Sequence, residues 1–254
     1  MTELTVRRPG PRAWLTLTVC EAKMVVRDTA GLVVPIGLPI LIMVMNASAA
    51  AGEQVVNGRS ALDVYVLPLV LTIVLTSIGV VNMPSFLAYY RRSGILRRLA
   101  VTPASPAMVL AAQMVVSLAQ AVIGIGAAYA VAVFAYGALP PVDLGVALGV
   151  AGLAVAAMYG TGMIVASVAP TPNSAVAIGL IAFFAFGAVG GMFGDTSALP
   201  DPLRQVGSWL PFGATVDALS AAWAGTAVDT SSLVGLALSA TLGAGVATVF
   251  FRWD

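Results

Sequence analysis

Five long stretches of this sequence contain no Asp, Glu, Lys or Arg. They cover residues 29–52, 64–90, 99–142, 144–194 and 230–251. A helix needs about 20 apolar residues to cross the hydrocarbon layer of a bilayer, so the first, second and fifth stretches each fit one crossing. The third stretch fits one long crossing, and the fourth fits two. The sequence therefore predicts an all-α integral membrane protein with six transmembrane helices.

The composition agrees with a membrane protein. Hydrophobic residues make up 59 % of the chain, whereas a soluble domain holds about 45–50 %. We expect residues 1–28 to form a cytoplasmic N-terminus with an interfacial helix, and residues 29–254 to form a six-span transmembrane domain. The predicted crossings run over about residues 30–50, 64–88, 106–136, 143–168, 174–193 and 231–251.

Basic residues are unevenly distributed along the chain. Ten of the twelve Lys and Arg residues lie before residue 29, within 91–98 or at position 252, and only Arg59 and Arg204 lie elsewhere. Seven of the eleven acidic residues show the opposite preference. Because positive residues stay on the cytoplasmic side during insertion, this pattern predicts that both termini and the 91–98 loop are cytoplasmic. An even number of crossings requires the same arrangement of the termini.

The segments outside the crossings have their own patterns. Residues 11–27 mix apolar and charged side chains, which is typical of an amphipathic helix in the membrane interface. Residues 195–229 are too polar and too rich in proline for a crossing, and they predict two short outer helices between the fifth and sixth crossings. Asn57-Gly58 predicts a turn in the first outer loop.

Small and proline residues inside the crossings also carry information. Pro35 and Pro39 lie in the first crossing, where prolines are tolerated if neighbouring groups satisfy the carbonyls that they free. Near the end of the fifth crossing, Gly187-x3-Gly191 overlaps Gly190-x3-Gly194. Small residues at this spacing let helix backbones approach closely. That approach serves either a dimer contact or packing within one chain, and the sequence leaves both open.

Four arginines lie close together in the loop after the second crossing, at positions 91, 92, 97 and 98. A nucleic-acid patch is disfavoured, because this cluster is small and is tied between two crossings. Arginines next to a membrane bind anionic headgroups, each contributing on the order of 1 kcal/mol. Lipid binding does not explain the residues around them. Ser93-Gly94 interrupts the helix of the second crossing, and residues 95–101 then predict one short amphipathic helix, which would suit docking to a moving partner.

The stretch "YRRSGILRRLAVTPASPAMVLAAQ" at 90–113 closely resembles the loop after the second crossing in membrane subunits of the ABC type-2 exporter family, including the daunorubicin-resistance type of drug-efflux permease. The resemblance extends over the whole chain and includes the outer segment "LPDPLRQVGSWLPFGATVDAL" at 199–219. Members of that family often carry a basic or amide residue several positions after the proline that corresponds to Pro211. This chain differs, because it has Asp217 and Ser220 there.

The resemblance implies several partners. Two copies of a cytoplasmic ABC ATPase would bind ATP and Mg²⁺, while this chain binds no cofactor itself. A second permease subunit, identical or similar, would complete a dimer within the lipid bilayer. The loop would form a coupling helix in a groove of the ATPase. The residues that would couple to the ATPase are Arg91, Arg92, Ser93, Gly94, Ile95, Leu96, Arg97, Arg98 and Leu99.

The sequence lacks the usual residues of several other functions. It has no histidine and only one cysteine, Cys20, so we expect no catalytic residue of the Ser-His type and no metal site. A P-loop requires Gly-x4-Gly-Lys-Ser/Thr, but the only lysine, Lys23, has no preceding glycine. The predicted crossings hold no ionisable group of the kind that drives proton coupling. Energy for transport must therefore come from a separate subunit.

These arguments predict the membrane subunit of an ATP-driven exporter for an amphipathic or hydrophobic compound that resembles a drug or antibiotic. Its cavity would lie between the first, second and fifth crossings, with the following cargo contacts: Met43, Met45, Asn46, Thr72, Thr76, Phe183, Phe184 and Met192. Export of a lipid or a lipid-linked glycan is the alternative within the same family. An intramembrane enzyme and a passive channel are alternatives from other classes. Arginine outnumbers lysine, which favours a GC-rich bacterial genome and a location in the bacterial plasma membrane.

Overall fold

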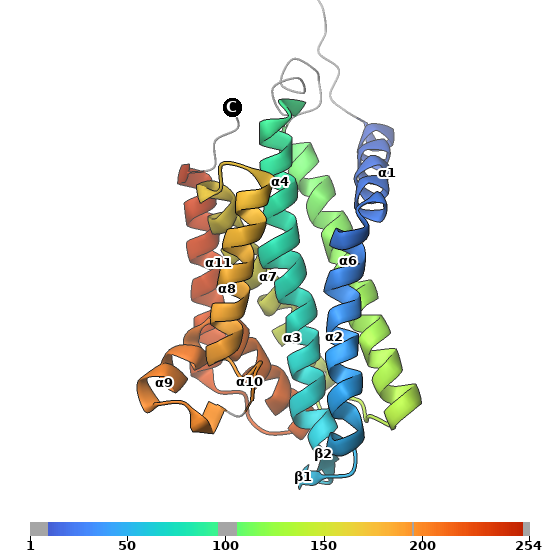
Figure 1. Ribbon diagram of the computed structural model, residues 1–254, viewed down its shortest axis with the longest axis vertical. Coiled ribbons are helices and arrows are strands. Elements are labelled where there is room, and N and C mark those ends of the chain that lie inside the picture. The colour runs from blue at the N-terminus through green and yellow to red at the C-terminus, as the bar shows by residue number, and fades with distance from the viewer. Residues whose placement is uncertain (1–9, 96–105, 195, 251–254) are drawn as a thin grey trace, which may run out of the picture.

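The computed structural model describes residues 10–95, 106–194 and 196–250. Within them lie six helices long and apolar enough to cross a membrane, and these form an upright bundle (Figure 1). They are α2 (Thr29–Ala50), a continuous helix from Leu62 to Arg92, α6 (Pro106–Tyr136), α7 (Leu144–Val168), α8 (Pro172–Val189) and α11 (Thr230–Phe250). The predicted all-α membrane fold is confirmed.

The second crossing is longer than predicted and contains two π-helical segments. It consists of η1 (Leu62–Val66), α3 (Leu67–Thr76), η2 (Ser77–Asn82) and α4 (Met83–Arg92), of which η1 and η2 are π-helical. Each π-helical segment ends two residues before a proline, Pro68 or Pro84. A proline cannot donate to the carbonyl four residues earlier. The π-helical register, with Met83 N–H donating to the Ile78 carbonyl, leads the chain into the second of these prolines.

The fifth crossing is shorter than predicted. Helix α8 ends at Val189 rather than near residue 193. Gly191 and Gly194 follow with φ angles of 90° and 146°, which a right-handed helix does not allow. The glycines that the sequence presented as a helix-packing pattern therefore also end the helix and turn the chain.

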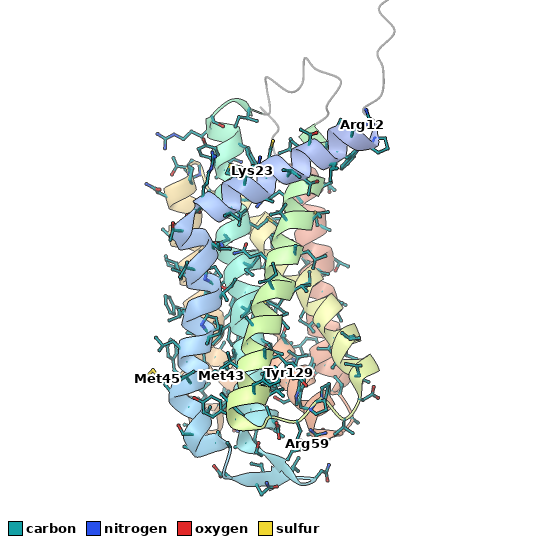
Figure 2. The ribbon with its side chains drawn as sticks, turned by 90° about the vertical axis from the view of Figure 1, so that its right-hand side faces the viewer. Arg12, Lys23, Met43, Met45, Arg59 and Tyr129 are labelled. Carbon is teal, nitrogen blue, oxygen red and sulfur yellow. The ribbon has the colours of Figure 1, made fainter. Side chains whose placement is uncertain are left out.

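The two ends of the bundle differ. At one end, α1 (Pro11–Arg27) lies obliquely across α2 and α6, as Figure 2 shows. The opposite end holds the strands β1 (Gln54–Val56) and β2 (Arg59–Ser60), the short 3₁₀ helix η3 (Thr196–Ala198), and the helices α9 (Asp201–Trp209) and α10 (Pro211–Ala224) (Figure 1). We call these the α1 end and the hairpin end. The two short outer helices predicted from the sequence are α9 and α10.

The hairpin is a feature that the sequence indicated only as a turn. Asn57 and Gly58 have φ angles of 50° and 71°. Positive φ at both central residues is what a type I′ hairpin turn requires. The side-chain amide of Asn57 donates to the carbonyl of Ala224 at 2.9 Å. The tip of the hairpin is thereby fixed to the end of α10.

Close backbone contacts hold the bundle together. Helix α11 packs most extensively on α7, and a Cβ added to Gly243 would lie 2.2 Å from the Cα of Gly160. At the end of α8, Gly190 lies against Phe212 and Gly213 of α10 in the same way. No larger side chain fits at such contacts, and membrane helices associate through them. Of the two uses left open by the sequence, packing within the chain accounts for Gly190.

The described basic residues separate between the two ends. Arg12, Lys23 and Arg27 of α1 and the two arginines that end α4 lie at the α1 end (Figures 1 and 2). Arg59 of β2 and Arg204 of α9 lie at the hairpin end. This is the separation that the sequence predicted. That the α1 end faces the cytoplasm stays a prediction from the rule on positive residues.

Candidate functional site

A cavity of about 890 Å³ lies at the hairpin end, in the size range of about 300–1,000 Å³ that holds one small ligand. Its walls come from α2, β1, the first half of the second crossing, the segment after α8, and α10 with the chain just after it. The lining residues from these walls include Ile42, Asn46, Tyr65, Leu69, Met192, Phe193, Asp217 and Ser220.

The wall after α8 depends on how that helix ends. The N–H of Met192 donates to the carbonyl of Gly187 at 2.8 Å, which turns the chain back on the helix. This turn places Met192 and Phe193 on the cavity wall. The ring of Phe193 also stacks on Phe184, with centroids 6.3 Å apart and an interplanar angle of 20°.

The wall formed by α10 is held by a buried aromatic contact. Phe212, in the first turn of α10, is fully buried and meets Phe183 of α8 edge to face, with ring centroids 6.4 Å apart. Further along the helix, Asp217, Ser220, Ala221 and Ala224 all line the cavity. Their spacing of i, i+3, i+4 and i+7 is that of one helix face. One face of α10 is therefore turned toward the cavity.

The residues that the sequence predicts as cargo contacts lie in three different environments. Asn46 and Met192 line the cavity, and Phe184 reaches it only through its stacking on Phe193. A second group is buried in the helix packing and consists of Met43, Thr72, Thr76 and Phe183. Met45 is 74 % exposed and points away from the bundle (Figure 2). Whether any of these residues contacts cargo stays a prediction.

The threonines of the second crossing show why polarity alone did not locate the cavity. The Thr72 hydroxyl donates to the carbonyl of Pro68 at 2.8 Å, and the Thr76 hydroxyl donates to the carbonyl of Thr72 at 2.7 Å. Both hydroxyls are thus satisfied within their own helix and are fully buried. Sequence reasoning had instead missed Tyr65, Phe193 and Asp217 as lining residues. The spacing of polar and small residues in α10 was the available signal.

Asp217 has the most unusual electrostatic setting in the cavity. It borders the cavity, and its side chain is exposed rather than buried in the helix packing. Protein atoms around the carboxylate remove part of its hydration and raise the pKa of Asp217, and the nearby carboxylate of Asp229 raises that pKa further. Both effects disfavour the negative charge of Asp217.

The start of the predicted coupling segment is fixed to the bundle at the α1 end. Helix α4 ends at Arg92, and Gly94 has a φ of 68°, so the predicted interruption at Ser93-Gly94 is confirmed. Arg91 donates to the carbonyls of Ala166, at 3.2 Å, and Ala169. It therefore ties the end of α4 to the end of α7.

The other predicted coupling residues differ in their surroundings. Arg92 is exposed. Ser93 bonds back to the carbonyl of Tyr90, and Ile95 packs beside that tyrosine. The remaining predicted coupling residues, Leu96, Arg97, Arg98 and Leu99, lie outside the described residues.

Helix α1 is held to the same region by a buried polar pair. Glu21 is only 5 % exposed, and its carboxylate accepts a hydrogen bond from the hydroxyl of Tyr90 in α4. Burial raises the pKa of Glu21, and the bond from Tyr90 offsets part of that rise. Val25 of α1 packs beside Tyr90 in the same apolar cluster. Helix α1 and the start of the predicted coupling segment therefore share one anchoring residue.

The first crossing is joined to its neighbours where a proline interrupts its own bonding. Pro35 has no N–H, so the carbonyl of Gly31 has no partner in its helix. The side-chain amides of Asn82 and Gln120 both donate to this carbonyl, at 2.5 and 2.7 Å. Neighbouring helices thus satisfy the carbonyl freed by Pro35, as expected for a proline in a crossing. The contact links α2, η2 and α6.

Together these observations define a multi-pass membrane protein whose helices surround a ligand-sized cavity at one end and fix an arginine-bearing loop at the other. The family described as ABC-2 family transporter protein matches residues 45–251, which is most of the chain. This chain belongs to that family and is a membrane subunit of an ABC transporter, which works with a cytoplasmic ABC ATPase. A comparison with curated proteins gives no match.

Proposed function

We propose that this chain is the membrane subunit of an ATP-driven exporter that moves an amphipathic or hydrophobic compound, similar to a drug or antibiotic, out of the cell. The observation that carries this proposal is the cavity at the hairpin end. Its volume of about 890 Å³ suits one compound of that size, and most of its walls are apolar or aromatic. Its few polar groups, among them Asn46 and Ser220, would orient a compound with one polar end.

The proposal assigns the energy supply to two copies of the ABC ATPase, which bind ATP and Mg²⁺ and dock on residues 91–99. The anchoring of Arg91 and Tyr90 supports this role. A force applied to the loop would pass directly to α7 through Arg91 and to α1 through Tyr90. A loop without such contacts would bend instead of moving the bundle. A second copy of the chain would complete the transporter.

The charges at the two ends of the bundle support an orientation in the membrane. The α1 end, which holds most of the described basic residues, faces the cytoplasm of a bacterial cell, and the hairpin end faces outward. The cavity would then release its cargo on the outer side. The ATPases would reach the loop from the cytoplasm.

The test is transport by the purified complex. The chain and its cognate ABC ATPase are reconstituted in vesicles, and ATP-dependent movement of a lipophilic fluorescent dye is measured. The expected result is movement that stops when the P-loop lysine of the ATPase is replaced. Transport by the chain without the ATPase would contradict the proposal. ATP-dependent movement of a labelled lipid or lipid-linked glycan, with no movement of the dye, would replace the proposed cargo with the alternative one.

A further inference from the structure

The carboxylate of Asp217 stands alone in the cavity. Among the described lining residues it is the only side chain of Asp, Glu, Lys or Arg. Within the described part of the chain it forms no hydrogen bond and no ion pair. An accessible carboxylate without a protein partner is free to pair with a cationic group of a ligand.

The basic residues at the hairpin end are engaged elsewhere. The Arg59 guanidinium donates to the carbonyl of Pro140 at 2.6 Å. The Arg204 guanidinium pairs with the carboxylate of Asp201 at 2.5 Å. The other described Lys and Arg residues belong to α1 or to the end of α4 and lie at the α1 end. The described part of the chain therefore supplies no cation to Asp217, and Asp229 adds only further negative charge near it.

The other walls suit the rest of a cationic amphiphile. Tyr65 and Phe193 line the cavity and are 55 % and 68 % exposed, so both rings are accessible to a ligand. Aromatic faces attract cations and also cover apolar surface. Met192 adds an adaptable apolar contact to the same wall as Phe193.

We propose that this cavity binds an amphipathic compound that carries one positive charge, an ammonium or a similar lipophilic cation, with Asp217 as its counter-ion. The proposal rests on the proposed function and names the charge of its cargo. The positive group of the compound pairs with the carboxylate of Asp217, while Tyr65, Met192 and Phe193 contact the apolar part of the compound. A neutral or anionic compound of the same shape leaves the carboxylate unpaired or repelled.

Two probes of nearly the same shape and opposite charge test this assignment on the purified full-length chain. Tetraphenylphosphonium is the cation and tetraphenylborate the anion, and equilibrium dialysis measures the binding of each. The unaltered protein is expected to bind the cation more tightly by about tenfold or more, because the carboxylate attracts the cation and repels the anion, and a contact with a charged group is worth at least that factor. Equal binding of the two ions would overturn the proposal, and this comparison needs no variant.

Variants locate the effect. Asp217→Asn should lower the affinity for tetraphenylphosphonium by about tenfold or more, and Asp217→Glu should keep the preference for the cation. Glu53→Gln is the matched control, because it removes an exposed carboxylate at the hairpin end that does not line the cavity. It should leave both affinities unchanged. Unchanged cation binding in Asp217→Asn would overturn the proposal.

Binding and transport distinguish this inference from the proposed function. If cation binding depends on Asp217 but no probe moves with ATP in reconstituted vesicles, the site assignment is supported and the export function is wrong. If a neutral dye is exported but tetraphenylphosphonium binds equally well to Asp217→Asn, export stands and the counter-ion role of Asp217 is wrong.

Discussion

A cluster of bonded polar side chains at the α1 end of the bundle contrasts with the cavity at the hairpin end. At the α1 end, Glu21, Tyr90 and Arg91 are all bonded to other parts of the protein. Slightly deeper, Asn82 and Gln120 are bonded to a carbonyl of α2. At the hairpin end, Asp217 borders an 890 Å³ cavity without a partner among the described residues.

This difference indicates a division of roles. Paired polar groups tie helices together, so the α1 end is built to move as one body when the loop is displaced. An unpaired carboxylate beside a cavity is available to a ligand of opposite charge. We therefore infer that the α1 end transmits force and the hairpin end receives cargo. The following predictions test that division, from the largest expected effect to the smallest.

Reversing charge in the coupling segment should have the largest effect. Replacing both Arg97 and Arg98 with Glu should abolish nearly all ATP-driven transport, because the ATPase would lose its docking contacts. Insertion and tetraphenylphosphonium binding should be unchanged, since the cavity lies at the other end of the bundle. Pulldown of the ATPase and vesicle transport measure the effect. Normal pulldown and transport in this variant would show that the ATPase docks elsewhere.

The next largest effect is expected at Arg91. Arg91→Ala should lower the stability of the folded protein by about 2–3 kcal/mol, because two carbonyls at the end of α7 lose a charged donor. Arg92→Ala is the matched control on the neighbouring, exposed residue and should change stability by less than about 0.5 kcal/mol. Thermal unfolding in detergent measures both. Equal effects of the two variants would contradict the structural role of Arg91.

The same residues show which parts of the structure could be predicted from the sequence. The crossings were predictable, because the length of an apolar stretch is a local property and the bilayer sets the required length. The partners of Arg91 and Tyr90 were not, because they lie 75 or more and 69 positions away in the chain. The cavity likewise requires knowing how α10 packs. Its clearest signal was Asp217 itself, a carboxylate on a largely apolar helix.

The Glu21–Tyr90 pair should make stability depend on pH. The pKa of Glu21 is raised from its ordinary value of 4.5, so the folded protein holds this proton more tightly than the unfolded chain does. The contribution of Glu21 to stability is then fully present below pH 4.5 and is lost as pH rises through the raised pKa.

This pH dependence is measured as thermal unfolding between pH 4 and 8. Stability should fall as pH rises through the lower part of that range, and Glu21→Gln should flatten this part of the curve. Tyr90→Phe should cost about 1 kcal/mol by removing one hydrogen bond. The same slope in Glu21→Gln and in the unaltered protein would assign the pH dependence to another group.

The smallest effect is expected at the hairpin. Asn57→Ala removes the bond to the Ala224 carbonyl and places alanine at a positive φ, which together should cost about 1 kcal/mol or slightly more. Because Val56 beside it lines the cavity, this variant also tests whether the hairpin shapes the binding site. If the hairpin only covers the end of the bundle, tetraphenylphosphonium affinity should stay within about twofold while stability falls. A larger loss of affinity would show that the Asn57 contact helps to hold the cavity open. The hairpin end would then depend on fixed polar contacts as the α1 end does, and the two ends would differ less in rigidity than proposed.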